Sequence, residues 1–227
     1  FNNKKYYNSK LQVQSDSRER QPLVYVNVDG GPGDMKNTSP AEVEEIMRYA
    51  GENPDKSIAV ITPFVNQRIL IERGIKENGF EHVVCGTVHA FQGDEKDVVL
   101  FSTALSDRTG KGTYDWLKNN KELINVATSR AKDKLILLAD GKELERLHQG
   151  NEDDDLYELV QYVKMNGESK ITEKHISSRA LGIQPFSTET EAAFMKNLTH
   201  ALENIWLTRM QIAESISSRL AQDVLAC

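Results

Sequence analysis

Five short and mostly apolar runs constrain the fold of this chain more than any other feature of its sequence. They occupy residues 23–28, 57–62, 83–88, 98–105 and 134–139. None shows the alternation of apolar and polar residues that is typical of a strand with one face in water. Segments with helical spacing or helix-capping residues separate the runs. This order predicts an α/β fold, a parallel sheet sandwiched by helices.

The helices between these runs have recognisable ends. Ser39, Pro40 and Glu42 have the order of a helix N-terminus: a capping side chain, a proline at the first helical position and the acidic residue of a capping box. Asn78 and Gly79 are typical of a helix C-terminus. A further helix is expected over residues 119–131.

The pattern changes after residue 150, where only helices are expected, at residues 153–165, 172–181, 188–205 and 210–225. The sequence therefore predicts two parts, a sheet domain over residues 1–150 and a helical extension or linker over residues 151–227. The acidic run at residues 152–155 is interpreted as a solvated partner of a helix N-terminus rather than a metal site. The amphipathic pattern near residue 194 fits a helical linker or partner-binding extension, with the start of a further fused domain as the alternative.

Charge and composition narrow the class of protein. The chain has 28 basic and 34 acidic residues, and the first 150 residues carry 21 and 22 of them, so the acidity is concentrated in the tail. No apolar run approaches the length of a membrane span, and Cys85 and Cys227 are too few for a disulfide framework. A cytoplasmic, reducing compartment is expected. Because the first residue is Phe1, the chain is expected to be an excised fragment.

Three polar junctions between the apolar runs carry the candidate chemistry, since ligands of parallel sheets bind where strands meet loops. The first is Thr-Pro-Phe-Val-Asn-Gln-Arg at residues 62–68, which alone would also fit a helix start with a solvated arginine. The second is the long insertion at residues 86–97, and the third is residues 125–133, where Arg130 is expected on a rigid helix. A planar, permanently charged arginine at such a rim suits phosphate recognition.

At these junctions the sequence resembles motifs IV, V and VI of superfamily 1 helicases, in the branch that includes the nonsense-mediated-decay helicase and its relatives. The motifs are Thr-Pro-Phe-x-x-Gln-Arg, Thr-Val-His-Ala-Phe-Gln-Gly-x-Glu-Lys-Asp and Asn-Val-Ala-x-Ser-Arg-Ala, in the order of that family. The aromatic segment at residues 6–11 also resembles its entry segment, so the resemblance covers residues 1–145. It implies a RecA-like P-loop NTPase fold, the UvrD-like helicase C-terminal domain of the AAA family.

The resemblance also implies roles in ATP hydrolysis. The chain would be the second RecA-like domain of a motor, closing over ATP and Mg²⁺ that are bound mainly by the first RecA-like domain. Arg130 would be the arginine finger, and Arg68 a second contact to the γ-phosphate. Gln67 and Glu95 would be ligands on the nucleotide side or couplers in the cleft. Gly93 would be a hinge that allows close backbone approach.

The same resemblance places single-stranded DNA or RNA across the top of both domains. The residues near its sugar–phosphate backbone would be Thr62, Pro63, Thr87, Val88 and His89. Such contacts hold a strand without reading its sequence. No membrane partner is expected.

Two absences limit what the chain is expected to do alone. No Gly-x-x-x-x-Gly-Lys-Ser/Thr loop is present; residues 110–113 have similar letters without the spacing, and a polar loop is expected there. No apolar run ends in Asp-Glu, so no magnesium or other metal site is expected. The chain is therefore predicted to be inactive as an isolated ATPase. The alternative is a non-catalytic RecA-like platform that binds nucleic acid or protein.

Overall fold

The computed structural model describes residues 1–10, 12, 19–29, 35–87, 91 and 95–172. The helices are α1 (Asn2–Tyr6), α2 (Pro40–Glu52), α3 (Val65–Asn78), α4 (Lys111–Lys118), α5 (Lys121–Ser129), α6 (Gly141–His148) and α7 (Asp155–Asn166). The strands are β1 (Leu23–Asn27), β2 (Ile58–Ile61), β3 (Val83–Gly86), β4 (Lys96–Ser102), β5 (Ala131–Ala139) and β6 (Glu168–Ile171).

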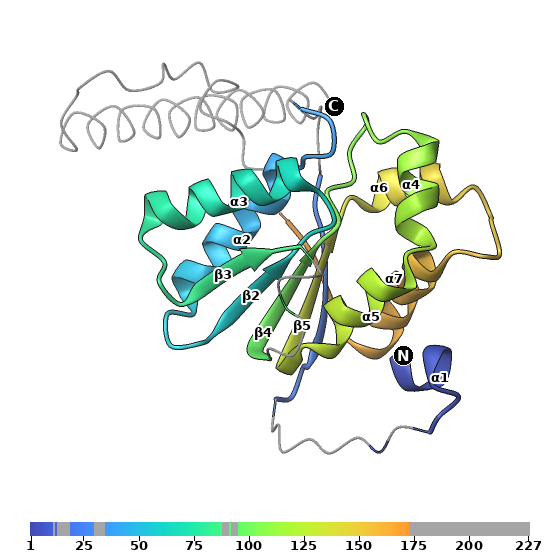
Figure 1. Cartoon of the computed structure of the whole chain (residues 1–227), viewed down its shortest axis with the longest axis horizontal. Coiled ribbons are helices and arrows are strands. Elements are labelled where there is room, and N and C mark those ends of the chain that lie inside the picture. Colours follow the sequence, from blue (N-terminus) through green and yellow to red (C-terminus); the bar gives the residue numbers. More distant parts are fainter. Residues whose placement is uncertain (11, 13–18, 30–34, 88–90, 92–94, 173–227) are drawn as a thin grey trace, which may run out of the picture. The chain divides into compact units, whose positions relative to one another are not determined.

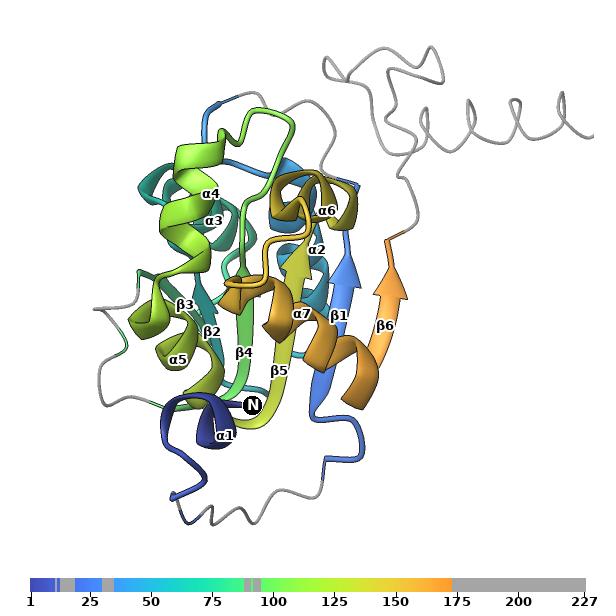
Figure 2. The same cartoon turned by 90° about the vertical axis from the view of Figure 1, so that its right-hand side faces the viewer.

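The strands form one sheet in the order β3-β2-β4-β5-β1-β6, and every neighbouring pair is parallel. Figure 2 shows the strand arrows pointing the same way, with β6 beside β1 at one side of the sheet. In the centre, Val99 of β4 aligns with Ala59 of β2 and Leu135 of β5. The predicted α/β fold with a parallel sheet is confirmed.

Both faces of the central part of the sheet are buried, which explains why β2 and the second halves of β4 and β5 show no alternation of buried and exposed residues. Along β2, Ile58 and Val60 pack with Ile46 of α2 and Ile71 of α3. The intervening Ala59 and Ile61 belong to the other apolar cluster, which α4, α5, α6 and α7 cover. In Figure 1, α2 and α3 lie on one side of the sheet and these four helices on the other.

Two elements, α4 and β6, contradict what was expected from the sequence. Residues 110–113 were assigned to a polar loop, but Gly110 is the N-cap of α4 and residues 111–113 form its first turn. Tyr114 and Leu117 of this helix are buried. A helices-only tail was expected after residue 150, yet β6 pairs with β1 from Val24↔Glu168 to Asn27↔Ile171. A polar edge strand is held by backbone hydrogen bonds and buries few side chains, so hydropathy does not reveal it.

The predicted boundary at residue 150 does not coincide with the observed one. The compact units are Phe1–Lys174 and His175–Cys227, because α7 packs against β1 and buries Leu156, Leu159 and Val163. The helix expected at residues 153–165 is confirmed as α7. The three helices expected further along lie outside the described residues. No helix in the described part is long and apolar enough to cross a membrane.

The acidic run before α7 was expected to be solvated, and that expectation is wrong for its last two members. Asp154 is the N-cap of α7, is 1% exposed and accepts a hydrogen bond from Tyr114 Oη at 2.6 Å. Asp155 is 2% exposed and pairs with Lys5 at 3.0 Å. The run therefore joins α7 to α4 and α1.

Candidate functional site

The two arginines predicted to meet one γ-phosphate lie at opposite edges of the sheet. Arg68 follows β2, so it belongs to the edge where the strands end, which we call the carboxyl edge. Arg130 precedes β5, at the edge where the strands begin, the amino edge. The 7 residues of β4 separate these edges by about 20 Å at ~3.3 Å per residue. The arginines also belong to helices on opposite faces, α3 and α5.

Arg130 is fixed at the amino edge by its backbone. The helix predicted over residues 119–131 ends at Ser129, and Arg130 is its C-cap rather than a residue on its face. The Arg130 carbonyl accepts a hydrogen bond from the Lys96 N–H at 3.1 Å, which joins the first residues of β4 and β5. Glu95, exposed and adjacent to Lys96, therefore lies at the same edge. Two of the predicted nucleotide-side residues are thus brought together.

The side chain of Arg130 has an unsatisfied donor. Its Nε atom is buried, and no hydrogen-bond partner for it occurs in the described part of the chain. A buried N–H without an acceptor costs free energy comparable to a lost hydrogen bond. Such a donor is expected where a ligand or another domain completes the site.

Asp97, next to this edge, is a positioning residue that the sequence analysis did not single out. Its carboxylate accepts hydrogen bonds from the Ser57 N–H at 2.9 Å and the Ser57 hydroxyl at 2.8 Å. The backbone bond from Ser57, aided by the hydroxyl, lowers the pKa of Asp97. These bonds fix the start of β2 against the start of β4. In the sequence, Asp97 is the acidic residue that ends the second motif, and that position is the feature that could have identified it.

Helix α1 is attached to the helix that leads to Arg130. Asn2 Nδ2 donates to the Asn125 carbonyl at 3.3 Å, and the Thr128 hydroxyl donates to Asn2 Oδ1 at 2.7 Å. Asn125 Nδ2 donates to the Tyr7 hydroxyl at 2.7 Å. These bonds tie the first residues of the chain to the third motif.

The carboxyl edge holds part of the predicted nucleic-acid site. Pro63 and Thr87 are partly exposed there, and the Thr62 N–H donates to the Gly86 carbonyl at 3.2 Å, which joins the ends of β2 and β3. The Thr62 side chain is 0% exposed, and its hydroxyl oxygen has no hydrogen-bond partner in the described part of the chain. Val88 and His89 lie outside the described residues.

The side chain of Gln67 is buried and hydrogen-bonded inside the domain. Its side chain is 0% exposed, and its amide oxygen accepts from the Ser39 N–H at 2.8 Å. Its amide nitrogen donates to the Ser39 carbonyl at 3.2 Å and the Ser102 hydroxyl at 3.0 Å. With these bonds made, Gln67 couples α3 to α2 and β4. Gly93, the predicted hinge, lies outside the described residues.

Glu42 is a buried acid under the carboxyl edge. Its N–H donates to Ser39 Oγ at 3.4 Å as a capping box requires, but its carboxyl group turns toward the end of β4. There it accepts hydrogen bonds from the Ser102 hydroxyl at 2.5 Å and from the Ala104 N–H at 3.0 Å. Ala104 has φ 52°, so this carboxyl group holds a strained backbone. Burial raises the pKa of Glu42 to about 8.

Glu42 is expected to make stability depend on pH. The folded state keeps the proton up to a pKa of about 8, whereas an exposed carboxyl releases it near 4.5. The unfolding free energy contributed by this group therefore falls as pH rises between these values, by up to ~1.4 kcal/mol per pH unit. Urea denaturation across this range should show a flatter profile for Glu42→Gln than for wild type. The exposed Glu77→Gln is the control, and equal profiles for all three proteins would contradict this assignment.

The described residues give little support for a cysteine nucleophile or a metal site. The Cys85 thiol is free, and burial raises its pKa to about 12, so it is protonated and a poor nucleophile. No group of three or more His, Cys, Asp or Glu side chains in the described ranges could hold a metal ion.

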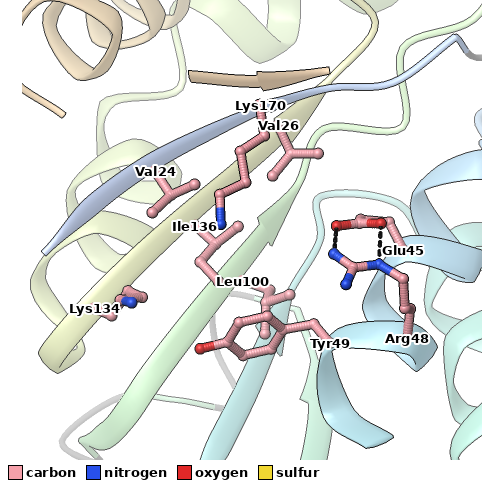
Figure 3. Close-up of a pocket in the computed structure, with 9 residues that line it drawn as sticks. All are labelled: Val24, Val26, Glu45, Arg48, Tyr49, Leu100, Lys134, Ile136 and Lys170. Carbon is pink, nitrogen blue, oxygen red and sulfur yellow. Dashed lines mark hydrogen bonds and ion pairs between the residues drawn. The ribbon is translucent and has the colours of Figure 1, made fainter. Parts of the chain in front are cut away.

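A small pocket opens on the face of the sheet that α2 covers (Figure 3). Its apolar lining comes from Val24, Val26, Leu100 and Ile136, with Tyr49 beside them. The cations of its rim are all paired: Arg48 with Glu45 and Glu52, Lys134 with Glu19, and Lys170 with Glu168. None of the predicted site residues lines it, and its charges are already neutralised by neighbours.

The comparisons with known proteins point to helicases. The family described as AAA domain matches residues 1–142. The chain is 30% identical over 146 residues to putative helicase mov-10-B.1 of Danio rerio, covering 52% of this chain and 14% of the relative. It is 32% identical over 124 residues to the regulator of nonsense transcripts 1 homolog of Drosophila melanogaster, covering 50% and 10%. The chain thus spans a small part of these relatives.

Two further matches come from a helicase/nuclease and a solved structure. The DNA replication ATP-dependent helicase/nuclease DNA2 of Mus musculus is 30% identical over 136 residues, covering 55% of this chain and 12% of the relative. The C-terminal domain of a possible DNA helicase from Lactobacillus plantarum gives a TM-score of 0.39 at 16% identity, covering 68% of this chain and 87% of that one. Because the family match covers more than half of its residues, this chain belongs to the AAA domain family, as a helicase-type domain.

Proposed function

We propose that this chain is the second RecA-like motor domain of an ATP-dependent superfamily 1 helicase. In this proposal its amino edge completes an ATP site, and its carboxyl edge contacts single-stranded DNA or RNA. The observation that carries it is Arg130, whose backbone is held between β4 and β5 while its buried Nε has no partner in the described residues. The helicases among the relatives support the same reading.

At the amino edge, Arg130 acts as the arginine finger. Bound ATP with Mg²⁺ supplies the phosphoanhydride, and its hydrolysis builds negative charge on the γ-phosphoryl oxygens. The planar guanidinium stabilises that charge without having to move far, because its backbone is already fixed. Exposed Glu95 stands beside it as the second nucleotide-side residue. Since the 227 residues contain no P-loop sequence, the phosphates are held mainly by a first RecA-like domain of the same protein.

At the carboxyl edge, Pro63 and Thr87 present polar and backbone groups to a sugar–phosphate backbone. Arg68 belongs to this edge and is assigned to nucleic acid rather than to the γ-phosphate. Among the described residues its side chain pairs with Glu72 at 3.0 Å, and both side chains are substantially exposed. An exposed pair of this kind contributes little, so a nucleic-acid phosphate can replace the carboxylate.

Binding of single strands tests the carboxyl-edge assignment. The chain should bind oligothymidylate or oligouridylate without strong sequence preference, and binding should weaken as salt rises. Arg68→Gln should weaken binding to both oligonucleotides equally and make the salt dependence shallower by about one phosphate contact. Arg73→Gln, on the exposed face of α3, is the control. A chain that binds neither oligonucleotide at low salt would contradict the nucleic-acid part of the proposal.

A further inference from the structure

Trp116 is a large aromatic side chain left half exposed beside the carboxyl edge. It belongs to α4, whose inner face is already filled by Tyr114 at 1% exposure and Leu117 at 0%. Trp116 is 50% exposed and faces away from that core. The packing of α4 against the sheet therefore does not require an indole at this position.

The one ring that Trp116 contacts in the described part of the chain is Phe64. Their ring centroids are 6.0 Å apart at an interplanar angle of 44°. Phe64 directly follows Pro63 and is 8% exposed, so its position is fixed by the fold. Phe64 thus supports one side of the indole and leaves the remainder accessible. The exposed ring lies beside the end of β2, where the proposed single strand passes.

The charges around the ring suit a nucleotide. The Arg68 N–H donates to the Phe64 carbonyl at 3.0 Å, so Arg68 lies one helical turn beyond Phe64 on α3. Lys111, in the first turn of the same helix as Trp116, is exposed. Asp115 is paired with Lys118 at 3.5 Å, so its charge is partly neutralised. An aromatic face with cations close by is the arrangement that binds a base and its phosphate together.

We propose that Trp116, supported by Phe64, is a stacking platform for one nucleobase of single-stranded nucleic acid. This inference rests on the proposed function, because it takes the carboxyl edge as the path of the strand. Every base has a π-face, so the platform adds affinity without sequence specificity. It would also fix the register of the strand relative to the backbone contacts at Pro63 and Thr87.

Tryptophan fluorescence tests the platform directly. In a Trp206→Phe background with selective excitation of tryptophan, Trp116 is the only tryptophan that emits, since the chain has two tryptophans. Titration with oligothymidylate should quench its emission and saturate at the same concentration as the anisotropy of a labelled oligonucleotide. Saturated anisotropy with unchanged emission would overturn the proposal, while the proposed function would stand.

Substitutions separate stacking from packing. Trp116→Leu keeps an apolar cover over Phe64 but removes the π-face, and we expect it to weaken binding roughly ten- to hundredfold. Trp116→Phe should retain most of the affinity. Met165→Ala, which removes an apolar side chain 77% exposed on α7, is the matched control and should bind like wild type. Wild-type affinity in Trp116→Leu would overturn the platform, whereas no binding by wild type would overturn the nucleic-acid assignment itself.

Discussion

Arg130→Ala is expected to lower nucleic-acid-stimulated ATP hydrolysis by roughly 10³- to 10⁵-fold in a longer protein that joins this domain to a P-loop domain, as the proposed function requires. The reason is that the guanidinium stabilises charge that develops only in the transition state, so kcat falls while ATP affinity changes much less. Steady-state turnover at saturating ATP and oligonucleotide measures this effect. Arg130→Lys keeps the charge but not the planar fork, so it should restore only part of the rate.

Two controls make the Arg130 result interpretable. Arg73→Ala removes an arginine that is 74% exposed on α3 and paired with Glu77, and it should leave turnover unchanged. Urea denaturation of Arg130→Ala should show a folded domain, because the bond that joins β4 to β5 at this point uses the backbone carbonyl of Arg130. ATP turnover that persists in a folded Arg130→Ala protein would contradict the arginine-finger assignment.

Gly167→Ala is expected to destabilise the fold by about 1–3 kcal/mol, as overpacking of a close contact does. Gly167 joins α7 to β6, and a Cβ atom there would overlap the Leu23 carbonyl oxygen and lie 2.8 Å from the Leu23 carbonyl carbon. These two Leu23 atoms belong to the backbone of β1, so they cannot move aside as the end of a flexible side chain could. Thermal denaturation should show a Tm lower by roughly 2–4 °C for each kcal/mol lost.

The matched control for this substitution is Gly112→Ala. A Cβ atom at Gly112 would meet nothing within 4 Å, and the residue lies in the first turn of α4. Alanine favours a helix over glycine, so the Tm should stay the same or rise slightly. Equal Tm values for Gly167→Ala and wild type would show that β6 is not packed against β1 as described.

The sheet and its burial could be predicted because they depend on side chains that the sequence displays. Residues 23–26 and 58–61 are apolar at consecutive positions, and both faces of the sheet are in fact covered. β6 could not be predicted in this way, since Glu168, Ser169 and Lys170 are polar and the strand is held by its backbone. α4 could not be predicted either, because its N-cap is Gly110 and its first turn contains a second glycine, a residue that disfavours helices.

The separation of Arg68 from Arg130 was available in the sequence but was not used. A residue that follows a strand of a parallel sheet lies at the carboxyl edge, and one that precedes a strand lies at the amino edge. Arg68 follows β2, whereas Arg130 precedes β5. The burial of Thr62, Gln67 and Glu42 could not be inferred, because it depends on how α2 and α3 pack around the end of β4.

The division of the domain into a nucleotide edge and a nucleic-acid edge is tested most directly by comparing Arg68→Ala with Arg130→Ala in one ATPase assay. Turnover is measured at increasing concentrations of oligouridylate or oligothymidylate in the longer protein. The account predicts that Arg130→Ala loses kcat at every oligonucleotide concentration. Arg68→Ala should need more oligonucleotide but reach the wild-type kcat at saturation. An equal loss of kcat at saturation in both variants would contradict this division.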